Sequence, residues 1–503
     1  MTRQGKWETD TDEIRNAADW AWESPPNGTY NAGKGLAYKY PLNDHGNAKR
    51  FVEKFGTDYR YNLTAKLWLH FDGVRWAQDA AAQAQAQEDA RTIAADLERD
   101  GKKVDFDLDA ATKKDHPDHY RQEWRKAMLG WAKASGMAFH IQKLLSLASS
   151  DKTVRVKKAD LDANPMLLAF PNGYLNLNTD ELTPPRRDAL VTKVCAAAYH
   201  AEATHPLWTW AQDRFMPNRE KRRDFFVAQG YCVTGRAKEH SFIAKGDTKC
   251  GKTTVCTAIK NALGDHAHGT GIETFASNKY AGAGGTREDL IALDGTRLVV
   301  ASETNENQRL NAAQLKRIAG GGDTLPVRGL YGSQYEMLPT FGLWLLTNFL
   351  PRVPADDDGL WERLHVFTFD QFIPPAERDE VKRDQTEDPA ISGSAVLASV
   401  LAGWRYYRDT LQQKLVLPSV ATETADARNT LDLMKLFIAE RCDEGPNLRC
   451  EVDVLKRCFR AFLRSEGVKE AYSDSSRSGE GRIERLASED GLEGGKQRLA
   501  WLA

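Results

Sequence analysis

Short apolar runs alternate with amphipathic segments through the middle of the chain. Ser241–Ala244, Arg297–Ala301 and Leu343–Thr347 are predicted to be buried strands, because their apolar residues are continuous. Residues 254–263 carry apolar side chains at helical spacing, and Gly264 follows as a stop signal. Strands that alternate with helices along the chain predict an α/β core built on a mostly parallel sheet.

The sequence before this core predicts mainly helices. The segments with helical spacing are residues 47–55, 79–97 and 124–148. Residues 68–76 alternate instead, and Asp72-Gly73 at their centre indicates a hairpin turn. Residues 171–177 indicate a turn followed by a strand.

The length and the changes of pattern divide the 503 residues into five predicted parts. They are an N-terminal arm (1–45), a mainly helical domain (46–205), the α/β core (206–375), a helical trailing segment (376–431) and a small C-terminal unit (432–503). The last unit is predicted to hold helices at 433–441 and 452–465, followed by short strands.

Composition narrows the class of protein. A hydrophobic content of 41% and a charged content of 28% are typical of a soluble globular chain. No apolar run approaches the length of a membrane span, and the N-terminus leads into charged sequence, so we expect neither a span nor a signal peptide. Seven thinly spread cysteines favour a reducing cytoplasm, and Cys442, Cys450 and Cys458 lack the paired spacing of a zinc site.

A net charge of −2 does not by itself indicate a nucleic-acid-binding protein. It does not exclude one either, because a ring that holds a strand in a central channel needs only local basic loops.

The most specific motif is GDTKCGKT at Gly246–Thr253, between a predicted strand and a predicted helix. Its glycines let the backbone wrap closely around phosphates, and the amide groups and helix N-terminus supply positive potential. Lys252 is expected to contact the β- and γ-phosphates of ATP, and the Thr253 hydroxyl to bind Mg²⁺. The predicted ATP-binding residues are Gly246, Asp247, Thr248, Lys249, Cys250, Gly251, Lys252, Thr253 and Thr254.

Two later strands end in polar residues that suit phosphate chemistry. Glu303 follows the second strand, where a carboxylate can hold Mg²⁺ through water or orient the attacking water. Asn348 follows the third, where an amide can donate to the γ-phosphate or fix the water. The alternatives are a surface glutamate and an asparagine in a strand-end turn; Glu306 is a weaker candidate than Glu303.

Between these strands, basic residues alternate with glycines. Lys316, Arg317 and Arg328 suit a hairpin near residues 316–331 that meets a phosphate backbone, and Tyr331 could stack on a base. A solvated basic loop is the alternative.

Arg352 and Arg363 come after the third strand. An arginine there can stabilise charge on a transferred phosphoryl group, often from a neighbouring subunit, although each could instead form a structural salt bridge.

These motifs in this order resemble the superfamily 3 helicases, AAA+ ring motors of small DNA viruses, phages and plasmids. The similarity is greatest to the phage and plasmid primase-helicase branch, which includes the poxvirus primase-helicase. In that resemblance Gly246–Thr253 is similar to Walker A, Arg297–Glu303 to Walker B, Leu315–Asp323 to the motif peculiar to the superfamily, and Thr347–Arg352 to motif C, with Asn348 as sensor. Trp361–Leu364 resembles the segment that carries the arginine finger, which favours Arg363 over Arg352.

The resemblance covers about residues 44–440, and the tail is similar to winged-helix units attached to such motors. Many members have two adjacent acids where this chain has Ser302 before Glu303, so the resemblance leaves open whether Glu303 serves the metal, the water or both. The roughly 45 residues ahead of the match are too few for a primase domain. We therefore do not predict primer synthesis.

The resemblance implies an ATP- and Mg²⁺-dependent DNA helicase, with 3′ to 5′ as the usual direction. It would act in the cytoplasm of a bacterial host or infected cell during replication of a phage, plasmid or other mobile element. A ring, expected to be a hexamer, would place ATP between subunits, and a separate primase or polymerase would supply primers. One alternative is a nucleotide-switched initiator that binds or melts origin DNA without processive unwinding. Another is a P-loop kinase, which the basic segment at 316–323 argues against.

Overall fold

The computed structural model describes residues 39–103, 118–236, 239–276, 287–302, 309–320, 322–328, 334–355, 357–444, 450–465, 496–497 and 499–501. The chain divides into two compact units. One comprises the described residues up to Asn164 together with Pro184–Lys193, and the other comprises Pro165–Thr183 and the described residues from Val194 onward. The five-part division expected from the sequence stays a prediction.

The first unit packs four helices against a small sheet. The helices are α3 (Asp44–Phe55), α4 (Ala80–Lys102), α5 (Asp118–Ser135) and α6 (Ala138–Ala148), and the strands are β1 (Tyr59–Asn62), β2 (Leu67–Phe71), β3 (Trp76–Ala77) and β4 (Arg155–Val156), in the order β3-β2-β1-β4. The predicted helices are confirmed. So is the hairpin, because β2 and β3 pair antiparallel and the Asp72 carboxylate accepts the amide hydrogens of Val74 and Arg75.

Cores made of side chains from helices and strands together hold this unit. Phe51, Tyr59 and Trp68 are buried with Leu97 of α4 and Met128 of α5. The description of this region as mainly helical holds, but two of its strands, β1 and β4, escaped prediction because they span only four and two residues.

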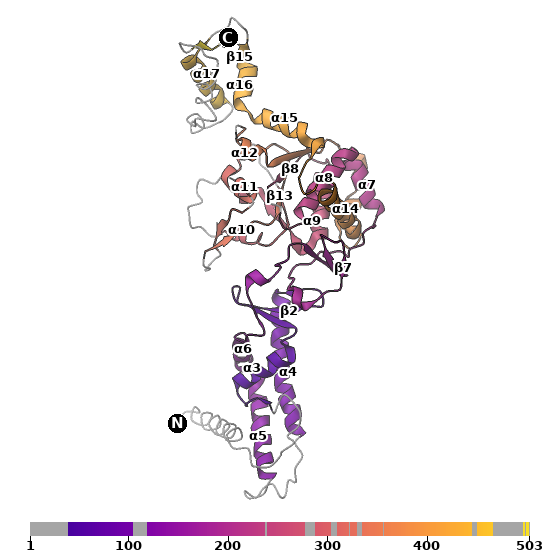
Figure 1. Cartoon of the computed structure of the whole chain (residues 1–503), viewed down its shortest axis with the longest axis vertical. Coiled ribbons are helices and arrows are strands. Elements are labelled where there is room, and N and C mark those ends of the chain that lie inside the picture. The colour runs from indigo at the N-terminus through magenta and orange to yellow at the C-terminus, as the bar shows by residue number, and fades with distance from the viewer. Residues whose placement is uncertain are drawn as a thin grey trace. The chain divides into compact units, whose positions relative to one another are not determined.

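The second unit is built on a five-stranded sheet in which every neighbouring pair is parallel, in the order β14-β8-β13-β10-β9 (Figure 1). The strands are β8 (Ser241–Lys245), β9 (Ala267–Gly271), β10 (Leu298–Ser302), β13 (Gly342–Thr347) and β14 (Leu364–Thr368). The three predicted strands are therefore confirmed. The outer strands β9 and β14 were not predicted, because β9 reads AHGTG, without an apolar run, and in β14 the apolar residues of LHVFT are interrupted by His365.

The sheet is covered on both faces, as its continuous apolar strands require. One face packs on α8 (Arg219–Cys232), α9 (Lys252–Leu263) and α14 (Gly393–Arg405), which Figure 1 shows grouped together, with α7 (Pro206–Phe215) joining the same core. The other face packs on α10 (Glu288–Ile291), α11 (Ala312–Ile318), α12 (Asp358–Trp361) and the hairpin of β11 (Leu325–Val327) and β12 (Tyr335–Met337). The molecule is thus a mixed helical and α/β protein with a parallel sheet, as expected.

The exposed edge of β14 is covered by α15 (Ala421–Leu431). The Thr424 hydroxyl accepts the Val366 amide hydrogen at 3.0 Å, and the Glu423 carboxylate accepts that of Thr368 at 2.8 Å. Glu423 also pairs with Lys221 of α8 at 2.6 Å. Side chains of α15 therefore accept the amide hydrogens of β14 that a further strand would otherwise bind. The covered edge cannot pair with another sheet.

The chain continues through α13 (Glu380–Glu387) before α14 and, after α15, into a small group with its own core. It contains α16 (Leu433–Arg441), α17 (Val452–Ser465) and two antiparallel pairs, β15 (Cys442–Glu444) with β18 (Leu499–Trp501) and β16 (Cys450–Glu451) with β17 (Lys496–Gln497). Phe437, Phe459 and Phe462 pack together at its centre. The two predicted helices are confirmed, whereas the winged-helix assignment stays a prediction.

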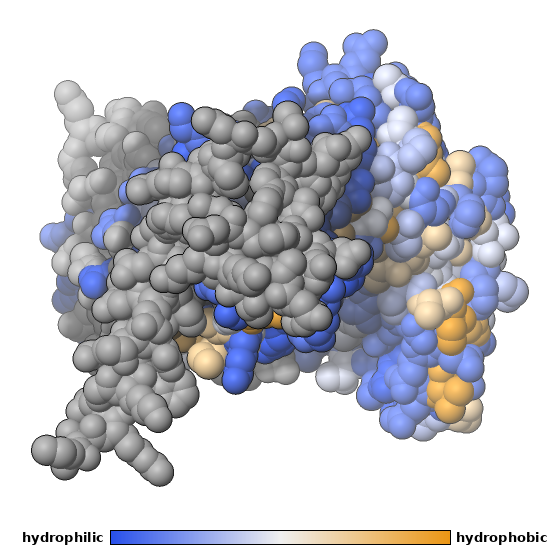
Figure 2. Space-filling model, turned by 90° about the horizontal axis from the view of Figure 1, so that it is seen from below, coloured by the Kyte–Doolittle hydropathy of each residue, from blue (hydrophilic) through white to orange (hydrophobic). Residues whose placement is uncertain are grey.

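No helix among the described residues is long and apolar enough to cross a bilayer. On the face seen in Figure 2, the coloured surface is mostly hydrophilic and its hydrophobic parts are small and separate.

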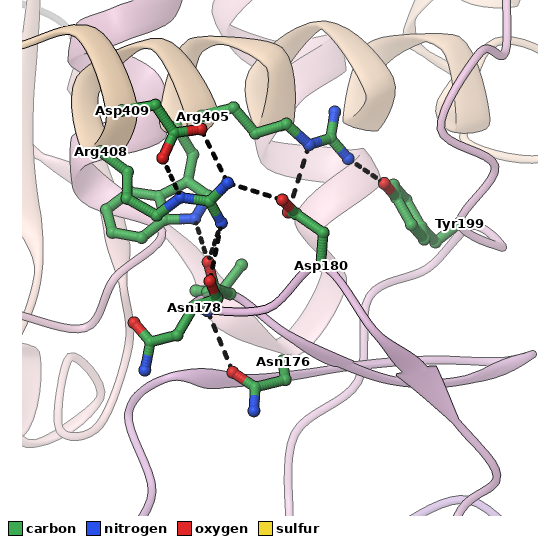
Figure 3. Close-up of polar contacts among 9 residues, drawn as sticks. Asn176, Asn178, Asp180, Tyr199, Arg405, Arg408 and Asp409 are labelled. Carbon is green, nitrogen blue, oxygen red and sulfur yellow. Dashed lines mark hydrogen bonds and ion pairs between the residues drawn. The ribbon is translucent and has the colours of Figure 1, made fainter.

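A charged network fixes a three-stranded sheet to the end of α14. The sheet consists of β5 (Leu167–Phe170), β6 (Gly173–Asn176) and β7 (Leu182–Thr183), and Asp180 lies in the turn before β7. Asp180 accepts from Arg405 at 3.2 Å and from Arg408 at 2.6 Å, as Figure 3 shows. Arg408 also donates to the Leu177 and Asn178 carbonyls, so two guanidinium groups join sequence segments more than 200 residues apart.

Asp180→Asn should lower the free energy of unfolding by about 1–2 kcal/mol, because Arg405 loses this carboxylate and Arg408 keeps only the more exposed Asp409. Asparagine tolerates the left-handed backbone of this position, φ 58°, so the change tests the charge alone. Urea unfolding measures the effect. Asp409→Asn is the control, since Asp409 pairs with Arg408 in solvent and should change little. Equal effects of the two variants would contradict the interpretation.

Candidate nucleotide-binding site

The loop Gly246–Gly251 joins β8 to α9 and is shaped by its two glycines. Gly251 has φ 86°, and a Cβ atom there would lie 2.3 Å from the Phe215 ring. A Cβ on Gly246 would lie 2.4 Å from the Phe369 carbonyl oxygen. The packing therefore admits only glycine at both positions, and no side chain caps the N-terminus of α9.

Lys252 is buried, with 7% of its surface exposed, and its ammonium group lies among oxygen atoms. It donates to the Gly246 carbonyl at 2.8 Å, the Asp247 carbonyl at 3.2 Å and the Asn348 side-chain oxygen at 2.6 Å. Two residues predicted for one site, 96 positions apart in the sequence, are thus in direct contact. Three oxygen acceptors match the three hydrogens of the ammonium group, so its hydrogen-bonding capacity is satisfied.

The sheet topology explains why these residues meet. β8 and β13 are neighbours, yet the chain leaves β8 toward β9 and leaves β13 toward β14, at the other edge. The carboxyl ends of strands at such a reversal are where open α/β sheets bind ligands. Gly246 directly follows β8 and Asn348 directly follows β13, so both lie at this edge.

The residues present fit a triphosphate. A backbone cradle that a Cβ would fill, an uncapped helix N-terminus and a buried ammonium group all favour an anion. Thr253 is exposed in the first turn of α9, where its hydroxyl is available to a metal. Asp247, Thr248 and Lys249 are exposed along the loop, whereas Cys250 is buried and Thr254 half-buried.

Glu303 lies outside the described residues, as do Glu306 and Tyr331. Its predecessor Ser302 ends β10, which pairs with β13 through Ala301 and Leu345. The predicted role of Glu303 stays a prediction.

The segment after β14 supports the loop from the other side, which the sequence did not predict. The Phe369 amide donates to the Lys245 carbonyl at 2.6 Å, and the Ile373 amide to the Lys249 carbonyl at 3.0 Å. Lys249 has φ 64°, so this bond holds a strained residue at the loop apex. No motif marks the segment, because it contributes backbone atoms.

Arg363 lies at the opposite edge of the sheet from the loop. It directly precedes β14, and Leu364 pairs with Ser241, the first residue of β8. β8 spans roughly 13 Å between that residue and the loop. Arg363 donates to the Gly359 carbonyl at 3.1 Å, so it does not join Lys252 and Asn348 within one chain. Arg352 lies four residues after Asn348, and its carbonyl accepts the Leu310 amide hydrogen.

The predicted DNA-contacting residues lie in the insert between β10 and β13. Lys316 and Arg317 are on α11, which precedes the hairpin, and not in the hairpin as expected. Leu315 and Ile318 are buried and Asn311 caps the N-terminus, which explains the helix. Arg328 is exposed directly after β11. A hairpin does form, but only β11 falls within the predicted region of residues 316–331, because β12 begins at Tyr335.

Two histidines form a half-buried pair near Arg363. His365 of β14 and His240, just before β8, have ring nitrogens 3.0 Å apart. Burial is the main cause that lowers the pKa of His365, to about 3, and the neighbouring His240 lowers it further. Burial likewise lowers the pKa of His240. Both rings are therefore neutral near pH 7.

Gly251→Ala should lower the free energy of unfolding by about 1–3 kcal/mol, from the positive φ and the clash with Phe215. Urea unfolding measures it. Gly322→Ala is the control, because a Cβ there meets no atom within 4 Å. Equal stability of Gly251→Ala and the wild type would contradict the loop geometry.

The histidine pair predicts acid sensitivity. Folding lowers the pKa of His365 to about 3. Between about pH 6.5 and about pH 3, this histidine is therefore protonated in the unfolded chain but neutral in the folded chain. As the pH is lowered through this window, protonation of the unfolded chain at His365 should reduce the free energy of unfolding by up to about 1.4 kcal/mol per pH unit. Unfolding of the wild type and of His365→Gln, measured from pH 7 to pH 4, should differ in slope; parallel curves would refute the assignment.

Comparisons with known proteins find similarity to viral proteins named putative helicase or putative primase. Residues 48–216 match the family model described as D5 N terminal like. The chain is 24% identical over 314 residues to the putative helicase L207/L206 of Acanthamoeba polyphaga mimivirus, covering 59% of this chain and 32% of that one. It is 25% identical over 312 residues to the putative primase C962R of African swine fever virus, isolate Warthog/Namibia/Wart80/1980, covering 57% and 32%.

The chain thus spans about a third of the length of these curated relatives. Among solved structures, the apo NrS-1 C-terminal region (305–718) aligns over 60% of this chain and 74% of that one, with 12% identity and a TM-score of 0.34. The chain therefore contains a D5 N-terminal-like region and is homologous to viral proteins named putative helicase or putative primase.

Proposed function

We propose that this protein is an ATP-dependent DNA helicase of the superfamily 3 type, with the parallel sheet as its P-loop AAA+ core, acting in replication of viral or other mobile DNA. The observation that carries the proposal is the 2.6 Å contact between Lys252 and Asn348. It joins a complete phosphate-loop sequence to a polar strand end in the order that the resemblance requires. The relatives named helicase and primase support the same role.

In this proposal the loop from Gly246 to Thr254 binds ATP. Lys252 balances charge on the β- and γ-phosphates, the Thr253 hydroxyl binds Mg²⁺, and Glu303 holds the metal or orients water. Bound ATP would supply the phosphoanhydride bond whose hydrolysis drives movement, and Mg²⁺ would neutralise negative charge on its phosphates. Asn348, already in contact with Lys252, is placed to sense the γ-phosphate.

Arg363 then acts on the loop of a neighbouring subunit. Its position at the amino end of β14 faces it away from its own loop, which favours a head-to-tail ring over a monomer. We propose a hexamer. A monomeric P-loop kinase would have no use for this arginine. The direction of movement, 3′ to 5′, stays an expectation from the resemblance.

DNA contact is proposed for Lys316, Arg317, Arg328 and Tyr331. The insert that contains them runs from β10, which ends just before Glu303, to β13, which ends just before Asn348. The insert is therefore joined at both ends to strands that lead to the nucleotide site, so hydrolysis of the nucleotide could move residues that contact DNA phosphates and bases. The described part of the insert contributes exposed Arg317 and Arg328, consistent with this use.

Lys252→Ala and Arg363→Ala should each abolish DNA-stimulated ATP hydrolysis and strand displacement, by at least about a hundredfold in rate. Mixing the two inactive proteins should restore part of the activity, because an intact arginine can then face an intact loop. A DNA-stimulated ATPase assay and displacement of a long duplex measure both effects.

The same assays separate the alternatives. Activity of Lys252→Ala would refute the motor, and full activity of Arg363→Ala would refute the shared site. DNA-stimulated hydrolysis without displacement of long duplexes would instead favour an initiator that melts origin DNA.

A further inference from the structure

The Asp357 carboxylate contacts two helices of the second unit, α11 and α12. α11 carries Lys316, for which DNA contact is proposed, and α12 precedes Arg363, for which a role at the neighbouring ATP site is proposed. One oxygen accepts the Leu360 amide hydrogen at 3.2 Å and caps the N-terminus of α12. The other lies 2.6 Å from the Lys316 ammonium group on α11. Asp357 is therefore bonded both to a predicted DNA-contacting residue and to the short helix that precedes Arg363.

Arg363 depends on α12 for its position. Its amide donates to the Leu360 carbonyl at 3.0 Å, and its guanidinium donates to the Gly359 carbonyl at 3.1 Å. α12 has only four residues and is too short to be stable alone. Its cap and its buried Leu360 and Trp361 must therefore define where it lies, and with it the direction of the arginine.

α15 holds the other side of the same segment. Arg428 donates from Nε to the Ala355 carbonyl at 2.7 Å and forms an ion pair with Asp358. The Trp361 indole donates to the Pro354 carbonyl at 2.9 Å, which closes the segment on itself. The Lys316 side chain is 39% exposed, so its ion pair with Asp357 is a contact of α12 that DNA could reach.

We propose that Asp357 is a positioning residue for Arg363 and competes with DNA phosphate for Lys316. The proposal rests on the roles proposed above for those two residues. With Lys316 paired to Asp357, the carboxylate is neutralised while it caps α12. When Lys316 turns to a phosphate, the carboxylate keeps the cap but loses its cation. DNA binding in one subunit is thereby linked to the helix that aims the arginine at the next subunit.

Asp357→Ala removes the cap and should lower kcat for ATP hydrolysis roughly tenfold while KM for ATP stays within about twofold, because the arginine acts in the transition state. Mixing Asp357→Ala with Lys252→Ala should restore activity. The arginine of the Lys252→Ala subunits is correctly placed, and random 1:1 mixing gives it an intact neighbouring loop at roughly one head-to-tail interface in four.

Asp357→Asn separates the two contacts. Asparagine caps a helix about as well as aspartate, so kcat should recover relative to Asp357→Ala. The charge that competes for Lys316 is gone, so the DNA concentration for half-maximal stimulation should fall by up to about fivefold. A merely structural role for Asp357 would predict no tightening of DNA binding.

Asp79→Ala is the matched control, because Asp79 caps α4 in the first unit through the Ala82 amide. It should keep the wild-type kcat and DNA response. The proposal is overturned if Asp357→Ala hydrolyses ATP like the wild type. It is also overturned if Asp357→Asn leaves half-maximal stimulation unchanged. A third contrary result is that mixing with Lys252→Ala rescues Arg363→Ala but not Asp357→Ala. Failure of the Lys252→Ala and Arg363→Ala mixture would instead refute the shared site itself.

Discussion

The buried ammonium group of Lys252 constrains much of the second unit. A charge removed from water is costly unless oxygen atoms surround it, and here two loop carbonyls and the Asn348 amide oxygen do so. The carbonyls are available only because Gly246 and Gly251 let the loop turn back on itself. Asn348 is available only because β13 lies next to β8 and ends in register with it. Loop shape, strand order and lysine position are therefore parts of one arrangement.

The two edges of the sheet carry different groups. The carboxyl edge holds the loop, Lys252 and Asn348, which suit phosphate binding. The amino edge holds groups that fix the structure, such as Arg297, whose guanidinium donates to the Val233 and Leu167 carbonyls at 2.6 Å each. Arg363 also lies at this edge, beside the neutral histidine pair. Two edges separated by the length of a strand can serve one reaction only if neighbouring subunits bring them together.

The flanking elements hold the sheet and the arginine segment by side-chain contacts with backbone groups. Glu423 and Thr424 satisfy the outer edge of β14, and Arg428 binds the Ala355 carbonyl. All three come from α15, so one helix stabilises both the strand after Arg363 and the segment before it. The Asp180 network does the same for the three-stranded sheet, through two arginines at the end of α14.

The sequence by itself determined the elements whose signals are local. The phosphate loop depends on glycine and lysine at fixed spacing, and β8, β10 and β13 on continuous apolar residues, so all four could be recognised without neighbours. The hairpin at Asp72-Gly73 and most helices follow equally from short-range patterns. The strand ends at Asn348 and Glu303 could be proposed because strand order along the chain suggested them.

Only the tertiary structure decided which of these residues meet. The contact of Lys252 with Asn348, and the separation of both from Arg363, follow from the strand order β14-β8-β13-β10-β9, which no local pattern encodes. β9 lacks strand-favouring residues and became a strand because β10 offered hydrogen bonds, whereas β14 combines its pairing with β8 with strand-favouring Val366 and Phe367. The double role of Asp357 was likewise invisible in the sequence, since Lys316 is 41 residues away and only folding brings its ammonium group to the carboxylate.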